Sequence, residues 1–395
     1  MNVLIIGGTG VLSSAVTAEA LKQGITVTMI NRGRRRIPEG VELIKADKGD
    51  LGYIAKQLEG RYFDAVMDFL CYTDEATRKS VQFYSNYTNQ YFFISSCAVY
   101  DTQGLGGKEG NEDSPKPLHL WDYSINKWES EKSLMELLKN TDTKYTVIRP
   151  CVTYDDTRIP YGITPQYGYH WTLVSRIKSG KPIITWNNGD NRCNMMRVED
   201  FAVGAVGLIG NPKAYNQAFN ICGDETPSFK EVLECLVDII GVKASTIDIS
   251  SEFYANEIPT RRGEIIGGRS IDTINSNKKV KEAVPSFKQS IPLREGVEKT
   301  LNAYRSQGYQ KGIDWQFDGD CDRVVRKWLK LNKLQRNESL GFVDYLGNAS
   351  FMDKLTYWSS YRKDSIAGKV VMIIIRDSQR FSRFMKRIAL KFKRH

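Results

Sequence analysis

The sequence is poor in histidine and lacks a long apolar run. Its three histidines, His119, His170 and His395, are far apart, so we predict no histidine-rich metal site. The seven cysteines include no CxxC pair and are odd in number, which argues against a zinc site or a disulfide framework and fits a reducing cytoplasm. The first apolar run ends at Gly7 and is too short for a secretory signal, and residues 370–375 are too few to span a bilayer.

Positive charge is concentrated near the C-terminus. Residues 376–394 contain eight Lys or Arg and one Asp, a local charge of +7, which leaves about +3 of the net +10 for the rest. Nucleic-acid binding by the main domain is therefore not predicted. Residues 378–395 alternate apolar and basic positions at helical spacing, which predicts a basic amphipathic helix. Such a helix suits peripheral contact with the inner membrane surface, or packing on its own domain or a partner.

Strands and helices alternate through the first 150 residues. The apolar run 3–6 predicts a buried strand, followed by a glycine turn, a helix over 12–22 and a second strand over 25–30. This alternation predicts an α/β fold with a Rossmann-like, doubly wound parallel sheet covered on both faces. Further strands are expected over 41–44, 64–69, 90–95, 145–148 and 218–221, and further helices over 51–58, 75–84, 121–138, 198–209 and 228–240.

The composition changes after Arg149 and Pro150. Residues 155–195 are rich in Gly, Pro, Tyr and Trp with little periodicity, which favours loops around a ligand. We therefore predict a dinucleotide-binding domain over 1–154, to which 196–224 return, and a smaller α/β substrate-binding part over 155–195 and 225–300. Residues 301–395 are interpreted as a basic helical C-terminal extension, of which 301–377 suggest no function.

The turn after the first strand has the spacing GxxGxxS, formed by Gly7, Gly10 and Ser13. Gly7 suits a tight turn, and Gly10 allows a pyrophosphate to approach the helix N-terminus, where N–H groups and the helix dipole favour anions. The second strand ends in Asn31 and Arg32 within a run of arginines, where an NAD-selective site usually has an acid. Guanidinium groups can pair with a 2′-phosphate, so NADP is favoured over NAD, with a solvated basic loop as the alternative. Asp47 is a candidate acceptor for the adenine amino group, or a simple turn residue.

Tyr123 and Lys127 lie in YSINK at i and i+4, which is one face of a helix. A phenol is a poor base at neutral pH, and a neighbouring ammonium is expected to lower its pKa. Tyr123 is therefore a candidate acid/base for hydride transfer at an alcohol or carbonyl carbon. Ser96 follows a predicted strand, at the sheet edge where ligands bind, and can donate a hydrogen bond to the reacting oxygen.

Four segments in this order and spacing, GGTGVLS, FISSCAVY, YSINK and VIRP, resemble the extended short-chain dehydrogenases, in particular the NAD-dependent epimerase/dehydratase family acting on nucleotide sugars. The resemblance covers about residues 1–300. It implies a Ser96–Tyr123–Lys127 catalytic set, a nucleotide-sugar substrate, a homodimer and a role in glycan or polysaccharide biosynthesis. The cofactor-binding residues that it implies are Gly7, Gly10, Val11, Leu12, Phe69, Leu70, Cys71, Tyr123, Lys127, Pro150 and Cys151.

Three positions depart from the family pattern. Dehydratases of the family carry an Asp-Glu pair where this chain has Cys97 and Ala98, so epimerase or ketoreductase chemistry is predicted rather than elimination. Val152 replaces an asparagine that contacts the diphosphate, and Arg192 is an alternative contact. The NRG and DFLCY segments are similar to an atypical branch that includes chloroplast stem-loop RNA-binding proteins. The alternative is therefore a non-catalytic dinucleotide-binding or RNA-binding protein.

Overall fold

The computed structural model describes residues 1–335, 337–341 and 349–377. Its centre is a sheet of seven strands in the order β10-β6-β5-β4-β1-β2-β3, and every neighbouring pair is parallel. The predicted doubly wound α/β fold is confirmed. The strands are β1 (Asn2–Ile6), β2 (Thr26–Asn31), β3 (Val41–Lys45), β4 (Ala65–Asp68), β5 (Gln90–Ile94), β6 (Lys144–Pro150) and β10 (Gln217–Ile221).

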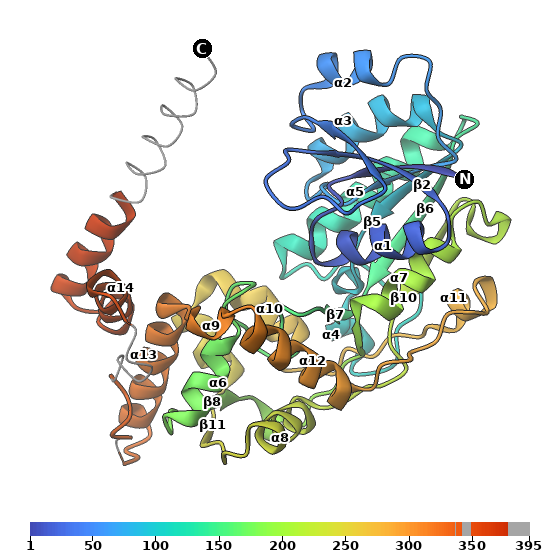
Figure 1. Cartoon of the computed structure of the whole chain (residues 1–395). Helices are drawn as coiled ribbons and strands as arrows, with labels where there is room; N and C mark the ends of the chain where they lie inside the picture. The colour runs from blue at the N-terminus through green and yellow to red at the C-terminus, as the bar shows by residue number, and fades with distance from the viewer. Residues whose placement is uncertain (336, 342–348, 378–395) are drawn as a thin grey trace, which may run out of the picture.

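Helices cover both faces of this sheet (Figure 1). Because alternate strand residues point to opposite faces, β1 contributes to two cores. Val3 and Ile5 pack with α1 (Val11–Lys22) and α7 (Val198–Gly207), whereas Leu4 and Ile6 pack on the other side. The helices on that other side are α2 (Leu51–Gln57), α3 (Asp74–Tyr84) and α5 (Asp122–Leu138).

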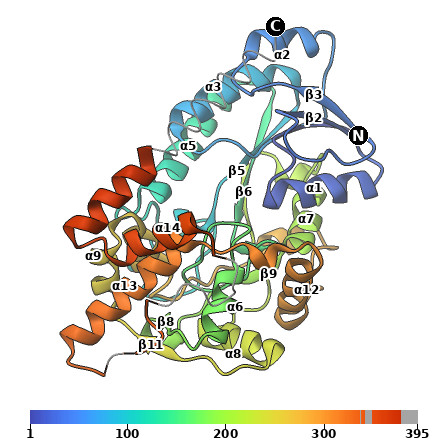
Figure 2. The same ribbon diagram turned by 60° about the vertical axis from the view of Figure 1, so that its left-hand side comes forward.

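The strand order reverses between β1 and β4. The chain runs outward from β1 to β2 and β3, then returns to place β4 on the other side of β1. Ligands of open parallel sheets bind at such a switch point, beyond the carboxyl ends of the strands. Figure 2 shows β5 and β6 running toward the second lobe, so this edge of the sheet faces the rest of the chain.

The second lobe is mainly helical and has its own core. The core joins residues 154–340 and includes Trp171, Phe229, Leu301 and Phe317. Its helices are α6 (Trp171–Lys178), α8 (Phe229–Ile240), α9 (Ser251–Glu257), α10 (Arg262–Gly268), α12 (Leu293–Ser306) and α13 (Trp315–Leu331). Two small parallel sheets pair β7 (Val152–Tyr154) with β9 (Met195–Arg197), and β8 (Ile183–Thr185) with β11 (Thr246–Asp248). The short helix α4 (Thr102–Leu105) contacts α10, and α11 (Lys278–Ala283) packs against α7 and β10.

Two features of this lobe differ from what the sequence suggested. Residues 155–195 contain α6, β8 and β9 in addition to loops. Residue 301, where the C-terminal extension was expected to begin, lies inside α12, and α13 belongs to the same core as residues 154–265. The domain limits stay a prediction.

Buried charges join α13 to α6. Arg176 donates to Asp318 at 2.5 Å and to Asp322 at 2.8 Å, and Lys181 lies 2.9 Å and 2.8 Å from the same two carboxylates. All four side chains are buried, and α14 (Phe351–Tyr361) adds a bond from the Tyr357 hydroxyl to Asp322 at 2.5 Å. The α13–α14 hairpin is therefore anchored from inside the lobe.

A further helix follows α14 and covers residues 366–377. No helix within the described ranges 1–335, 337–341 and 349–377 is long and apolar enough to cross a membrane. The basic amphipathic segment predicted over 378–395 lies outside the described residues.

Candidate functional site

The glycine turn after β1 has the backbone that a dinucleotide site requires. Gly7 and Gly8 have φ of +110° and +73°, a region that other residues rarely adopt. Gly10 precedes α1, and its N–H donates to the Ser13 hydroxyl at 2.8 Å. Ser13 therefore caps the helix from the third position of the motif. The N–H groups of the first turn have no acceptor within the helix and point to where an anion would lie.

The segment after β4 is held by one buried carboxylate. Asp68 accepts hydrogen bonds from the Leu70 N–H at 2.7 Å, the Tyr91 hydroxyl at 3.3 Å and the Ser80 hydroxyl. Lys48 reaches over the same loop and donates to the Leu70 carbonyl at 2.7 Å. These contacts fix Phe69, Leu70 and Cys71 beside the glycine turn.

The end of β2 is tied to the same turn. The Asn31 amide donates to the Gly7 carbonyl at 3.0 Å and accepts from the Gly33 N–H at 2.6 Å. Arg32 and Arg35 are both exposed, and Arg35 donates to the Thr9 carbonyl at 2.5 Å and lines the adjoining groove. Asp47 is also exposed and accepts the Gly49 N–H at 3.1 Å, as a turn residue does.

Ser96, Tyr123 and Lys127 converge at the carboxyl end of β5. The Ser96 hydroxyl accepts the Ala98 N–H at 3.1 Å, and Ser96 and Tyr123 line the same cavity. Lys127 is buried, and its ammonium donates to the carbonyls of Cys71 and Ile94 at 2.8 and 2.7 Å. The ammonium lies 5.9 Å from the centre of the Tyr123 ring. The two residues thus share one helix face, as their spacing predicts.

Burial governs the titration of this pair. Desolvation raises the pKa of the Tyr123 phenol to about 12, although the residue is 36% exposed, and it lowers the pKa of the buried Lys127 to about 8. We had expected Lys127 to lower the pKa of the phenol. The pKa is raised instead because burial penalises the phenolate and two carbonyls hold the ammonium. Tyr123 is therefore a protonated phenol at neutral pH.

A groove of about 1020 Å³ runs along these elements. Of the predicted cofactor residues, Gly10, Val11, Leu12, Phe69, Leu70, Tyr123 and Lys127 line it. Gly7, Asn31 and Cys71 do not line the groove, and the hydrogen bonds described above hold them behind the residues that do. Arg32 and Asp47 do not line it either. Tyr169 and Tyr309 from the second lobe form its far side. The open face of Gly10, the α1 N-terminus and the size of the groove fit a nicotinamide dinucleotide.

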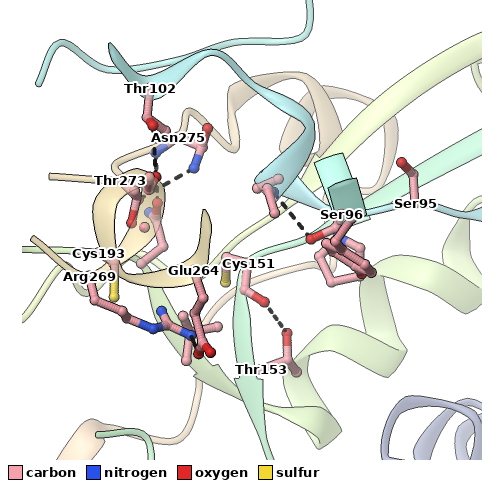
Figure 3. A pocket seen from close by; sticks show the side chains of 18 of the residues that line it. Ser95, Ser96, Thr102, Cys151, Thr153, Cys193, Glu264, Arg269, Thr273 and Asn275 are labelled. Carbon is pink, nitrogen blue, oxygen red and sulfur yellow. Dashed lines mark hydrogen bonds and ion pairs between the residues drawn. The ribbon is translucent and has the colours of Figure 1, made fainter. Parts of the chain in front are cut away.

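A smaller cavity of about 340 Å³ opens beside Ser96 and Tyr123. Ser96, Tyr123, Pro150, Cys151 and Val152 line one side of it. Figure 3 shows Arg269 and Glu264 across this cavity from Ser96, with Cys151 between them. The apolar Val152 side chain therefore faces the space where the family pattern has an asparagine.

Two arginines of the second lobe line the same cavity. Arg158 donates to the Thr153 carbonyl at 3.1 Å and the Tyr167 hydroxyl at 3.3 Å, and Arg269 lies 3.4 Å from Glu264. The Nε atoms of both arginines are buried without a hydrogen-bond partner among the described residues. Arg192 is not in the lining and pairs with Glu231 at 3.7 Å.

The two positions where dehydratases carry acids hold no acid here. Ala98 has no titratable group. The Cys97 thiol donates to the Arg149 carbonyl at 3.2 Å and lies 3.4 Å from the Cys222 sulfur, and burial raises its pKa. Neither residue can act as an acid or base at neutral pH.

Sequence reasoning missed Asp68, Arg35, Arg158 and Arg269. Arg35 lies in the arginine run after the second strand, in which the sequence did not distinguish one arginine from another. Arg158 lies in residues 155–195, which were interpreted as loops around a ligand. Asp68 looked like an ordinary strand residue, and nothing local marks Arg269.

In a comparison with known proteins, residues 3–222 match the NAD dependent epimerase/dehydratase family. The chain is 26% identical over 347 residues to the chloroplast stem-loop binding protein of 41 kDa b from Arabidopsis thaliana, covering 84% of this chain and 85% of that protein. It is 28% identical over 222 residues to the UDP-glucose 4-epimerase of Vibrio cholerae, covering 54% of this chain and 63% of that protein, slightly less than two thirds.

Solved structures share the fold. The UDP-glucuronic acid 4-epimerase from Bacillus cereus, in complex with UDP-glucuronic acid and NAD, superposes with a TM-score of 0.59 at 16% sequence identity. The match covers 78% of this chain and 100% of that one. At this identity the likeness concerns the fold alone.

Proposed function

The chain belongs to the NAD dependent epimerase/dehydratase family, and we propose that it is an NAD(P)-dependent epimerase or ketoreductase that transfers hydride reversibly at a sugar carbon of a nucleotide sugar. The observation that carries the proposal is the convergence of Ser96, Tyr123 and Lys127 at the junction of the long groove and the smaller cavity. A place in glycan or polysaccharide biosynthesis, and a homodimer, stay predictions of the family resemblance.

The chemistry follows from the groups at this junction. A bound dinucleotide supplies the hydride donor or acceptor. In the direction of reduction, Tyr123 donates its phenolic proton to the carbonyl oxygen as hydride reaches the carbonyl carbon, and an alcohol forms. Ser96 orients that oxygen through its hydroxyl. In the direction of oxidation the Tyr123 phenolate takes the proton of the alcohol as hydride leaves the carbon.

The smaller cavity suits a substrate with an anionic group. Its second-lobe side presents the guanidinium groups of Arg158 and Arg269, each with an unpaired Nε. Guanidinium groups bind phosphate and carboxylate oxygens through paired N–H groups. The UDP-sugar ligand of the Bacillus cereus epimerase carries groups of both kinds, which supports a nucleotide sugar for this chain.

NADP is the cofactor that we favour. β2 ends in Asn31 and is followed by arginines, so no acid is available there for the ribose hydroxyls. Arg35 is held at the groove by its bond to Thr9 and can meet a 2′-phosphate. The Bacillus cereus structure contains NAD, so NAD is the alternative.

The test combines cofactor titration with turnover. NADPH and NADH are titrated calorimetrically into the wild type, Arg35→Ala and, as the matched control, Arg32→Ala. We expect NADPH to bind more tightly than NADH and Arg35→Ala to weaken NADPH alone by roughly tenfold, the value of one charge-assisted hydrogen bond. Tyr123→Phe should lower turnover of a UDP-sugar or its keto form by about 10²–10⁴-fold, with Tyr62→Phe as control. Equal loss of turnover in both tyrosine variants would contradict the catalytic role.

A second candidate function has its own support. The Arabidopsis thaliana relative, which matches over most of both chains, is described as a stem-loop binding protein. Stem-loop RNA binding without cofactor binding by the wild type would favour this candidate and remove the enzyme proposal.

A further inference from the structure

The helix of residues 366–377 exposes an apolar face, which we call the outer face. It consists of Ile366, Val370, Ile373 and Ile374, whose side chains are 84%, 49%, 50% and 59% exposed. Gly368 and Ile375 are buried on the opposite face. A surface helix of a globular protein normally exposes polar residues and buries its apolar stripe. Here apolar residues occupy both faces, and the exposed ones have no partner among the described residues that covers them.

The orientation of this helix is set by the anchored hairpin before it. Asp364, in the turn between α14 and the helix, lies 3.9, 3.9 and 3.8 Å from Arg323, Arg326 and Lys327 of α13. Arg326 also donates to the Tyr361 carbonyl at 3.1 Å. Figure 1 shows the helix at the margin of the molecule, away from the seven-stranded sheet. These contacts tie the turn before the helix to α13.

The sequence continues this apolar pattern into basic surroundings. After Ile373 and Ile374, the spacing of three to four residues is interrupted at Asp377 and resumes with Phe381, Phe384, Ile388 and Phe392. Eight Lys or Arg and one Asp occupy residues 376–394. Apolar residues at helical spacing between clustered basic residues are the composition that binds an anionic lipid surface.

We propose that the outer face of the helix of residues 366–377 is a docking surface for an anionic membrane, and that the basic residues after it supply the electrostatic attraction. Burial of the four aliphatic side chains among acyl chains removes their contact with water. A second copy of this chain is the other occupant that an apolar face could take. It is disfavoured because pairing two such helices would bring two charges of +7 together.

The experiment is flotation of the full chain with vesicles of phosphatidylcholine, with and without phosphatidylglycerol. We expect binding to the anionic vesicles only. The double variant Ile373→Asp/Ile374→Asp should weaken it by more than tenfold, because two buried aliphatic groups are replaced by carboxylates. Tyr62→Asp, an equally drastic change at an exposed residue of the other lobe, is the matched control and should not affect binding.

A second variant tests the charge separately. Lys386→Gln/Lys391→Gln/Lys393→Gln should weaken binding by about a hundredfold at low salt, because each basic residue near an anionic surface contributes about a fivefold factor. Sedimentation velocity of each variant reports the oligomeric state, and its circular dichroism reports folding. No binding by the wild type, equal binding to neutral vesicles, or unchanged binding by the isoleucine variant would overturn the proposal. A dimer that the isoleucine variant dissociates, without vesicle binding, would assign the outer face to a second copy.

Discussion

The two lobes each bury carboxylates, but they use them differently. In the sheet lobe, Asp68 bonds to the backbone and side chains of the segment that follows its own strand, and that segment lines the long groove. In the second lobe, Asp318 and Asp322 pair with Arg176 and Lys181, which are 137 or more residues away in the sequence. No member of this second cluster lines either of the two cavities of the site.

The difference separates positioning from architecture. Burying a charge costs free energy, and only good pairing offsets that cost. We therefore expect each cluster to have a specific role in the protein. Asp68 fixes the shape of a loop that lines the long groove. The charges of the second lobe join α6 to α13, and through Tyr357 to α14, and so hold the C-terminal helices on the lobe. Loss of one carboxylate should therefore affect ligand binding in the first case and stability in the second.

The largest effect should come from Asp322→Ala. Burial alone would raise the pKa of Asp322, but Arg176 and Lys181 hold it below its ordinary value, so the carboxylate is charged in the folded protein. Its removal takes away one of the two carboxylates that the buried cations Arg176 and Lys181 share. We expect a loss of about 3–5 kcal/mol in the free energy of unfolding, measured with urea.

The control for this variant is Glu295→Ala, which breaks an exposed pair with Lys299 at 3.3 Å. It should change the free energy of unfolding by at most about 0.5 kcal/mol. Under conditions where Asp322→Ala is folded, its cofactor affinity should equal that of the wild type. Weaker cofactor binding by the folded variant would break the separation between the two clusters.

Asp68→Ala should have a smaller effect on stability and a larger one on binding. The variant leaves the Leu70 N–H and the Ser80 hydroxyl without the Asp68 acceptor, whereas the Tyr91 hydroxyl keeps its bond to Ser80 at 2.9 Å, and we expect a cost of about 1–3 kcal/mol in the free energy of unfolding. Because Leu70 then loses its fixed position, cofactor affinity should fall by about tenfold, as measured by calorimetry. A variant that is destabilised but binds cofactor as the wild type does would make Asp68 a purely structural residue.

Features set by local sequence patterns could be predicted from the sequence, whereas contacts between distant segments could not. The alternation of apolar strands and helices predicted the doubly wound sheet, because local periodicity reflects which residues face the core. It also brought Ser96 and Tyr123 into one region, because the carboxyl ends of parallel strands share one sheet edge. The partners of Asp322 could not be predicted, since Arg176 and Lys181 approach α13 only through the packing of the lobe. The direction of the Tyr123 pKa depends on burial in the same way.

A third effect concerns the pH dependence of stability at Lys127. Burial lowers its pKa to about 8 in the folded protein, from an ordinary value of about 10.4 in the unfolded chain. Below pH 8 both states are protonated, and the folded state carries the full cost of a buried ammonium. Between about pH 8 and 10 the unfolded chain binds more protons, so stability rises with pH.

Comparison with Lys127→Met isolates this contribution from the tyrosines that titrate at higher pH. The difference in free energy of unfolding, wild type minus variant, should increase by at most about 1.4 kcal/mol per pH unit between about pH 8 and 10 and be constant below that range. The measurement is urea unfolding at a series of pH values. A difference that stays constant up to pH 10 would mean that the ammonium keeps an ordinary pKa, and that the bonds to Cys71 and Ile94 fully repay its burial. Lys127 would then resemble the well-paired charges of the second lobe, and the contrast between the two lobes would not extend to the Tyr123–Lys127 pair.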